Sequence, residues 1–462
     1  MSEILTDEKI HEECGVFGIY GRGNIDAARL IYYGLTALQH RGQESAGMVV
    51  CDTCGPIGNI SAYIDMGLVN EVFDGLKLKK LVGNIGIGHV RYSTTGESTR
   101  ENAQPVFINY AKGTIALAHN GNITNTESIR KELIAEGAVF AGTSDSEVIA
   151  YRIAKERMKT SSIEEASENV ARILKGGFAL LILSPRKLIC IRDPWGLKPL
   201  CLGSMSGITV CASESSAINA IGADHVRDVA PGEMVVITEE GVTSRQILHS
   251  EVKAHCAFEY IYFARLDSKI DGQGVYAARI RGGRSLAQRY PVDADVVTGV
   301  PDSGLTAAAG YAMQSGIPFE LAFARNSYVG RTFIKPSQDE RTSSVAIKLR
   351  VIEDVVKGKR IVLTDDSIVR GTTLANIIRE MRKFGALEVH VRISSPPFLY
   401  PCYYGTDVPD NSQLIASGST KEEIRQRIGA DSLEYLHIED LDEMTCHLPL
   451  CKACFDGRYP VG

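Results

Sequence analysis

Residues 360–373 read RIVLTDDSIVRGTT. The apolar run Arg360–Thr364 has the length of a strand, and two adjacent carboxylates, Asp365 and Asp366, stand at its end. A turn rich in Ser, Gly and Thr then leads into a helical pattern over Leu374–Phe384. Continuous apolar strands of this kind are typical of a parallel sheet buried on both faces. Two carboxylates in a turn are often only solvated, but this complete strand–turn–helix pattern favours a site for phosphate at the helix start.

A similar arrangement occurs upstream. The apolar run Asp295–Val300 is followed by the turn Pro301–Gly304, which opens another helical pattern. Backbone amides at such a turn can hold pyrophosphate. Two strands of this type, each followed by a helix, predict a doubly wound α/β sheet in the second half of the chain.

The first half has a different character. Short strand-like runs are separated by Gly, Asn and Thr turns, and helical patterns cover Ala27–His40 and Ser144–Met158. This predicts stacked antiparallel sheets covered by helices. A chain of 462 residues is too long for one ordinary core, so we expect two domains with a seam near Thr243–Lys253.

The composition describes a globular enzyme of the cytoplasm. Hydrophobic residues make up 44% and charged residues 23%, and the net charge of -6 argues against a general nucleic-acid-binding surface. No apolar run approaches the roughly 20 residues that a membrane span needs. The segment Met1–Glu13 is polar and acidic, so it is not a secretory signal.

A cysteine, Cys14, precedes a Gly-rich strand-like segment, which by itself fits an ordinary buried thiol. Four further blocks change that interpretation: HRGQES at 40–45, HVRYST at 89–94, HNGN at 119–122 and TSDSE at 143–147. In this order the blocks resemble the N-terminal-nucleophile glutamine amidotransferases over roughly the first 240 residues. The resemblance implies a four-layer αββα glutaminase domain.

The resemblance also assigns roles to individual residues. Cys14 would be the nucleophile, and its own α-amino group, which titrates near about 8, would be the base. The fragment 1–13 would therefore be a propeptide that is removed autocatalytically. Asn120 and the Gly121 amide would form the oxyanion hole.

Glutamine carries a carboxylate and an ammonium at its far end. Arg91 would bind the carboxylate with two hydrogen bonds, and Asp145 would hold the ammonium. Asp145 also precedes a helical pattern, so an N-cap is its alternative role. We interpret the histidines of these blocks, His40, His89 and His119, as structural.

The second half resembles the type I phosphoribosyltransferases, and RIVLTDDSIVRGTT is similar to their signature for 5-phosphoribosyl pyrophosphate. Asp365 and Asp366 would face the ribose hydroxyls and one Mg²⁺ per subunit, with help from Ser303. The remaining residues of the predicted phosphate cradle are Ser367, Arg370, Gly371, Thr372 and Thr373. The polar stretch Tyr328–Arg350 looks like the loop that closes over substrate in this family; a plain surface loop is the alternative.

Together the two halves resemble the glutamine phosphoribosylpyrophosphate amidotransferases, which begin purine biosynthesis. The resemblance implies a glutaminase domain at 14–245 and an α/β phosphoribosyltransferase domain at 246–462. It further implies that ammonia passes internally between the sites, that purine nucleotides inhibit, and that the enzyme is a homotetramer. A phosphoribosyl-binding regulator without catalysis is the alternative, although a regulator would not need a complete glutaminase.

The chain has eleven cysteines, and disulfides are not expected in a reducing compartment. Cys190, Cys201 and Cys211 lie in strand-like runs and are expected to be buried, inert thiols. Cys51 and Cys54 have the spacing of a metal-binding pair but no matching second pair.

Four other cysteines make a candidate metal site. Cys451 and Cys454 form a closely spaced pair, and Cys256 and Cys402 would complete a four-thiolate site suited to zinc or an iron–sulfur cluster. Resemblance to the Bacillus-type branch of the family favours one [4Fe–4S] cluster per subunit, and Cys446 is the rival ligand. We expect this site to be structural and remote from both reactions.

Overall fold

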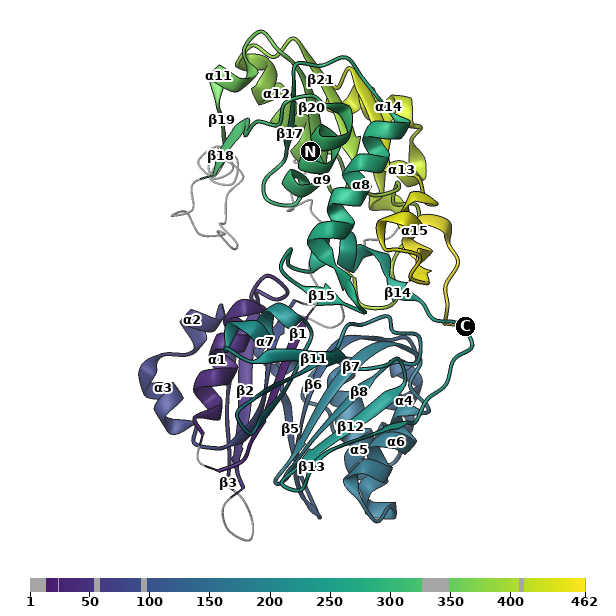
Figure 1. Ribbon diagram of the computed structural model, residues 1–462. Helices are drawn as coiled ribbons and strands as arrows, with labels where there is room; N and C mark the ends of the chain where they lie inside the picture. Colours follow the sequence, from purple (N-terminus) through teal and green to yellow (C-terminus); the bar gives the residue numbers. More distant parts are fainter. Residues whose placement is uncertain are drawn as a thin grey trace.

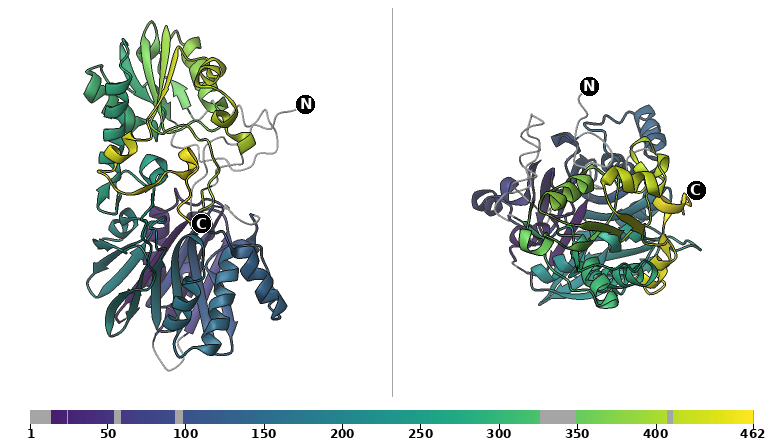
Figure 2. Two further views of the ribbon diagram at one scale, coloured as in Figure 1. Left: turned by 90° about the vertical axis from the view of Figure 1, so that its right-hand side faces the viewer. Right: turned by 90° about the horizontal axis from the view of Figure 1, so that it is seen from above.

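The computed structural model describes residues 14–23, 25–53, 59–92, 98–325, 349–406 and 411–461. Figure 1 shows two lobes, the first half of the chain below and the second half above, and the side view in Figure 2 shows the same division. None of the helices within these ranges is long and apolar enough to cross a membrane.

The lower lobe is built on two antiparallel sheets. The first sheet has the strand order β11-β9-β10-β1-β4-β2-β3. Its strands are β1 Gly15–Gly21, β2 Ser45–Asp52, β3 Asn59–Met66, β4 Ile85–Arg91, β9 Cys201–Met205, β10 Ile208–Ala212 and β11 Asp224–Asp228. All seven residues of β1 are buried, because the strand lies at the centre of its sheet with another layer on each face.

The second sheet has the order β13-β12-β8-β7-β6-β5. Its strands are β5 Val106–Tyr110, β6 Gly113–Ile123, β7 Gly176–Ser184, β8 Lys187–Arg192, β12 Glu233–Thr238 and β13 Gly241–Gln246. The two sheets face each other through a shared apolar core to which β1, β4, β6 and β7 contribute, for example Val16, Ile87, Ala118 and Leu181.

Helices cover the outer face of each sheet. The first sheet is covered by α1 Ala27–Ala37, α2 Val69–Val72, α3 Gly75–Lys80 and α7 Ser215–Ala220, and the second by α4 Thr126–Ala135, α5 Asp145–Lys159 and α6 Ile163–Ala171. A short 3-10 helix, η1 Arg100–Asn102, precedes β5. This order of layers confirms the predicted αββα arrangement, and α1 and α5 lie where the helical patterns placed them.

The upper lobe contains a four-stranded sheet in the order β17-β20-β21-β22, and every pairing in it is parallel. The strands are β17 Val296–Gly299, β20 Arg360–Asp365, β21 Glu388–Ile393 and β22 Ser432–Tyr435. β17 and β20 are buried on both faces, which explains their continuous apolar sequence. The parallel sheet predicted for the second half is thereby confirmed.

Helices cover both faces of this sheet. One face packs against α8 Val275–Arg289 and α9 Gly304–Ser315, and the other against α12 Thr372–Lys383 and α14 Lys421–Ile428. Smaller elements complete the lobe: β18 Phe323–Arg325, β19 Leu349–Val351, α11 Glu353–Val356, η3 Asn411–Gln413, α13 Ile415–Gly418 and α15 Asp440–Met444.

Short elements lie where the lobes meet. A π-helix, η2 Glu259–Phe263, precedes the hairpin of β15 Lys269–Ile270 and β16 Gln273–Gly274. The C-terminal segment, yellow in Figure 1, returns to this junction, where β23 Leu450–Cys451 pairs in parallel with β14 His255–Cys256 and leads into α16 Ala453–Asp456. Residues almost two hundred positions apart are thus joined by backbone hydrogen bonds.

Candidate functional sites

Cys14 directly precedes β1, the central strand of the first sheet. β1 pairs with β4, with Gly15 opposite Val90, so Cys14 lies beside the end of β4 that carries Arg91. The Cys14 side chain is buried, and its Sγ lies 3.5 Å from the Tyr92 carbonyl oxygen. Sheet pairing therefore places the predicted nucleophile next to the predicted glutamine-carboxylate ligand.

Burial raises the pKa of the Cys14 thiol to about 11, and the nearby Arg91 only partly opposes this effect. At neutral pH the sulfur is therefore protonated and a poor nucleophile, because the thiolate is the reactive form. Catalysis at this position needs a base within reach of the sulfur, as the α-amine hypothesis requires.

Asn120 and Gly121 lie on β6, across the sheet interface from Cys14. The Asn120 side chain is fully buried, and neither its nitrogen nor its oxygen has a hydrogen-bond partner among the described residues. Buried amide groups are almost always paired, so such a donor suits an external acceptor. Gly121 has a φ of 137°, and a Cβ there would lie 2.0 Å from the Gly177 carbonyl oxygen, so only glycine fits.

Asp145 is the first residue of α5 and is buried. It accepts a hydrogen bond from the Ile123 amide at 3.1 Å, and its Oδ1 lies 3.5 Å from His119 Nδ1. Burial alone would raise the pKa of Asp145, but His119 and these hydrogen bonds hold it below its ordinary value. The N-cap alternative is wrong, because Ser144 is the N-cap and accepts from the Glu147 amide.

The neighbouring side chains of the block motifs hold this site in place. His40 lies 2.7 Å from Glu214, and His89 is bonded to the His119 carbonyl at 3.0 Å, with its pKa lowered to about 3 by burial. Both fit a structural role. Two contacts at this site were not predicted from the sequence. Glu44 lies 3.8 Å from Arg91, and His119 contacts Asp145. Neither contact has a sequence signal, because the partners lie far apart in the chain.

The second site lies at the carboxyl end of β20. Asp365 and Asp366 are buried, and Asp366 accepts hydrogen bonds from Ser367 Oγ at 2.5 Å and from Ser303 Oγ. The turn after β17 thereby meets the turn after β20. The meeting is close: a Cβ on Gly304 would lie 2.4 Å from the Thr364 carbonyl oxygen.

The predicted phosphate cradle is the N-terminus of α12. Gly371 is its N-cap with a φ of 87°, which favours glycine, and Thr372 and Thr373 form the first turn. Arg370 precedes them and donates to the Gln413 side chain. Backbone amides at a helix start, beside two buried carboxylates, can hold a phosphate and a divalent cation together.

Several predicted features lie outside the described residues. They are the segment 1–13, Ser93 and Thr94 of the HVRYST block, Cys54, and residues 328–348 of the predicted substrate loop.

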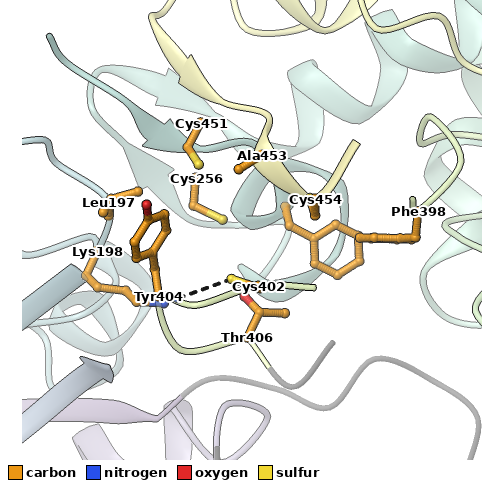
Figure 3. Close-up of a pocket in the computed structure, with 11 residues that line it drawn as sticks. Leu197, Lys198, Cys256, Phe398, Cys402, Tyr404, Thr406, Cys451, Ala453 and Cys454 are labelled. Carbon is orange, nitrogen blue, oxygen red and sulfur yellow. Dashed lines mark hydrogen bonds between the residues drawn. The ribbon is translucent and has the colours of Figure 1, made fainter. Parts of the chain in front are cut away.

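A pocket at the junction of the lobes contains all four predicted thiolate ligands (Figure 3). Its remaining lining is largely apolar, with Phe258, Phe398 and Tyr404, and one buried cation, Lys198. The parallel β14–β23 pair sets Cys256 directly opposite Cys451. Cys446 is exposed and is missing from the described residues that line the pocket.

The thiol chemistry of this pocket is compatible with a bound metal. Burial raises the pKa of Cys451 to about 12. Burial also raises the pKa of Cys454, and the charges of the other three cysteines act in the same direction. A metal cation would stabilise such buried thiolates. The sulfurs are not preassembled, however: within the described ranges no group of three or more His, Cys, Asp or Glu residues stands at metal-binding distances.

The pocket is close to the amidase residues, which corrects the expectation of a remote position. Gly405, three residues after Cys402, approaches Gly121 so closely that a Cβ on it would lie 2.9 Å from the Gly121 carbonyl carbon. Cys190, Cys201 and Cys211 are buried in the αββα core as expected, and Cys51 of β2 is buried there as well.

Fold and sites together define a glutamine amidotransferase joined to a phosphoribosyltransferase. Residues 89–220 match the family described as glutamine amidotransferase domain, and residues 276–394 match the phosphoribosyl transferase domain. An amidophosphoribosyltransferase of Methanocaldococcus jannaschii is 47% identical over 97% of this chain and 98% of its own length. The Bacillus subtilis amidophosphoribosyltransferase is 46% identical over 98% of this chain and 95% of its own.

Comparison with solved structures points to the same family. The glutamine phosphoribosylpyrophosphate amidotransferase of Bacillus subtilis, complexed with ADP and GMP, superposes with a TM-score of 0.90 at 45% identity. The match covers 97% of this chain and 98% of that one. The chain belongs to the amidophosphoribosyltransferase family. It is an enzyme of the first step of purine biosynthesis, with glutamine amidotransferase and phosphoribosyltransferase domains in that order.

Proposed function

We propose that the chain hydrolyses glutamine at Cys14 and transfers the ammonia internally to 5-phosphoribosyl pyrophosphate, giving phosphoribosylamine and pyrophosphate. The observation that carries the proposal is the convergence of Cys14, Arg91 and Asp145 in one lobe and of Asp365, Asp366 and Ser303 in the other. We place the division between the two catalytic domains at residues 245 and 246.

The amidase half would work with few groups. Arg91 and Asp145 orient glutamine through its carboxylate and ammonium, and Cys14 attacks the side-chain amide carbon. The Asn120 amide and the Gly121 N–H donate to the oxyanion, and loss of one such donor typically costs about 3–4 kcal/mol of transition-state stabilisation. The buried, protonated thiol supports a base at the α-nitrogen, hence removal of residues 1–13.

The transferase half would bind its substrate at both ends. The amides of the α12 N-terminus, with Ser367, Arg370, Gly371, Thr372 and Thr373, hold the 5′-phosphate, and Asp365 and Asp366 hold the ribose hydroxyls. Ser303 and the two aspartates would hold one Mg²⁺, which when bound would supply positive charge beside the pyrophosphate group. The buried, clustered oxygen donors fit this hard cation.

The four junction cysteines would hold a [4Fe–4S] cluster, with zinc as the alternative. The donor set fits, since Cys256, Cys402, Cys451 and Cys454 line one pocket. Metal binding here would add to folding free energy and join the start of the second domain to the C-terminus. Purine nucleotides are the proposed regulators, as the ADP- and GMP-bound relative suggests, and a homotetramer is the proposed assembly.

One experiment tests the coupled reaction. Purified protein is given phosphoribosyl pyrophosphate, Mg²⁺ and amide-¹⁵N glutamine in the presence of unlabelled ammonia, and pyrophosphate and product isotope are measured. Pyrophosphate release with mostly ¹⁵N product supports internal transfer. Product with the isotope ratio of the bulk ammonia would contradict it, and glutamate release without pyrophosphate would contradict the transferase assignment.

A further inference from the structure

Residues 402–405, here called the strap, run from the thiol pocket to the amidase strand β6. The strap begins at Cys402, whose Sγ accepts a hydrogen bond from the Tyr404 backbone amide at 3.4 Å (Figure 3). Its next residue, Tyr403, accepts a hydrogen bond at its carbonyl from Asn122 Nδ2 at 2.8 Å. Asn122 follows Asn120 and Gly121 on β6, so the second domain is hydrogen-bonded one residue beyond the proposed oxyanion hole.

Gly405 makes the closest approach. It has a φ of 110°, and a Cβ built on it would lie 2.9 Å from the Gly121 carbonyl carbon, 3.1 Å from the Gly121 Cα and 3.1 Å from Lys198 Nζ. Two of these three atoms belong to the backbone, which cannot swing aside as a flexible side chain can. The strap therefore packs against Gly121, the residue whose N–H is proposed to stabilise the oxyanion.

The strap is held from its other side as well. The Tyr403 ring packs against the Tyr459 ring, tilted by 44° with ring centres 4.8 Å apart, and the Tyr404 hydroxyl is hydrogen-bonded to the backbone of Val461. Cys402 itself belongs to the thiol pocket. Three contacts thus fix the strap: the pocket, the C-terminal residues and β6.

We propose that the strap positions the oxyanion hole for glutamine hydrolysis, with Gly405 as a positioning residue that acts through Gly121. The thiol pocket then influences the amidase reaction through Cys402 and is more than a staple for folding. This inference rests on the proposed function of Asn120 and Gly121.

The test is the variant Gly405→Ala, measured for glutaminase activity and for ammonia-dependent product formation. The oxyanion exists only in the transition state, so we expect kcat for glutamine hydrolysis to fall about 10- to 100-fold with an unchanged KM. Ammonia-dependent turnover and metal content should stay within about twofold. The matched control is Gly429→Ala in the same domain, also at positive φ (76°) but with nothing within 4 Å, which should leave both activities unchanged.

A double-mutant cycle shows whether Gly405 acts through the oxyanion hole. In an Asn120→Ala background the effect of Gly405→Ala on kcat should differ from its effect in the unmodified enzyme, because the Asn120 and Gly121 donors share one oxyanion and coupled groups are not additive. Asn122→Ala, which removes the bond to Tyr403, should lower kcat in the same direction without adding bulk. Full additivity, equal loss of both activities, or unchanged glutaminase activity in Gly405→Ala would overturn the inference. An Asn120→Ala enzyme with normal glutaminase activity would instead overturn the proposed oxyanion hole.

Discussion

At the amidase site, the surroundings of each side chain determine its protonation state. Cys14 is an ordinary thiol by type, yet burial raises its pKa to about 11 and makes a neighbouring base necessary. Asp145 is buried to a similar degree, yet His119 and the Ile123 amide keep it ionised. The same burial therefore produces a neutral thiol and a charged carboxylate, because only the carboxylate has partners that favour its charged form.

Replacing Cys14 separates the two reactions. Cys14→Ala should abolish glutamine-dependent turnover, while turnover with free ammonia at high pH should stay near the starting rate, since the second site is untouched. Both rates are measured as pyrophosphate release, and the exposed Cys446→Ala is the control. Intact-mass analysis should show a mature chain that begins at Cys14; a fully active enzyme that retains residues 1–13 would refute the α-amine base.

Replacing the paired carboxylates removes the second reaction. Asp365→Asn together with Asp366→Asn should eliminate product formation from glutamine and from ammonia, because both would hold Mg²⁺ and ribose. Asp293→Asn is the control, since Asp293 is exposed and pairs with Arg360 at the opposite end of β20. Ammonia-dependent turnover near the normal rate in the double variant would show that the phosphoribosyl site is misplaced.

At the scale of elements, close helix packing positions the start of α9. A Cβ on Gly283 of α8 would lie 2.0 Å from the Ala307 carbonyl oxygen of α9, and one on Gly310 of α9 would lie 2.2 Å from the Ile280 carbonyl oxygen. The two glycines let the helix backbones touch. This contact fixes α9, whose first residue, Gly304, follows Ser303 of the proposed Mg²⁺ site.

Adjacent glycines of α8 provide a matched comparison. Gly283→Ala should lower the free energy of unfolding by about 1–3 kcal/mol, because backbone atoms of α9 must move away. Gly282→Ala should be neutral or stabilising, since its Cβ would meet only side-chain atoms of Met444 and Leu436, at 3.4–4.0 Å, and alanine favours helix. Chemical denaturation measures both; equal effects at the two positions would contradict the packing argument.

At the scale of the whole molecule, buried ion pairs join the lobes. Asp271, in the hairpin of the second domain, accepts hydrogen bonds from Arg192 of β8 at 2.7 and 2.8 Å and lies 2.8 Å from His255 Nδ1. Burial opposes ionisation of Asp271, but Arg192 and His255 outweigh it and hold its pKa well below the ordinary value. Asp228 faces the same cluster, and burial together with Asp271 raises its pKa.

The depressed pKa of Asp271 determines the sign of its pH effect. Its contribution to stability is present above the unfolded-state value of about 4 and is lost as the pH falls through the lower folded-state value. Asp271→Asn should cost about 3–5 kcal/mol at neutral pH, because Arg192 is left buried without its partner. Asp228 has the opposite effect. Because its pKa is raised in the folded state, its ionisation lowers the free energy of unfolding as the pH rises through its unfolded-state value.

The control for this pair is Asp267→Asn, which removes an exposed partner of Arg265 and should cost less than about 1 kcal/mol. Unfolding free energies from pH 3 to 7 should show a weaker acid dependence in the Asp271→Asn variant. A pH profile parallel to that of the unmodified protein would exclude Asp271 as its source.

The metal pocket gives the last prediction at this scale. Anaerobically purified protein should be brown, with about four irons and four sulfides per chain. Serine at Cys256, Cys402, Cys451 or Cys454 should give little soluble protein, whereas Cys51→Ser should be nearly silent, since its Sγ already donates to the Pro185 carbonyl at 3.2 Å. Colourless protein with stoichiometric zinc would show that the four cysteines bind zinc and not an iron–sulfur cluster. Full iron content in the Cys402→Ser variant would show that Cys402 is not a ligand.

Local patterns in the sequence were enough to predict the main elements, and they provided the hypothesis for the chemistry of each site. The apolar run 360–364, the carboxylates after it and the Gly-Thr-Thr turn predicted β20, its loop and α12 within two residues, because strand, turn and helix preferences act over short distances. The order of the four amidase blocks likewise identified Cys14, Arg91, Asn120 and Asp145 as one set.

Contacts between distant residues were decided only by the tertiary structure. The N-cap at Ser144, the His119–Asp145 contact and the Arg192–Asp271 pair join groups whose approach depends on how sheets and lobes pack. The thiol pocket is the clearest case. Cysteine spacing pointed to Cys451 and Cys454 and the family resemblance to Cys256 and Cys402, but the contact of Gly405 with Gly121 places the pocket beside the amidase strand. Sequence spacing carries no information on such an approach, because the chain folds back across more than two hundred and eighty residues to make it.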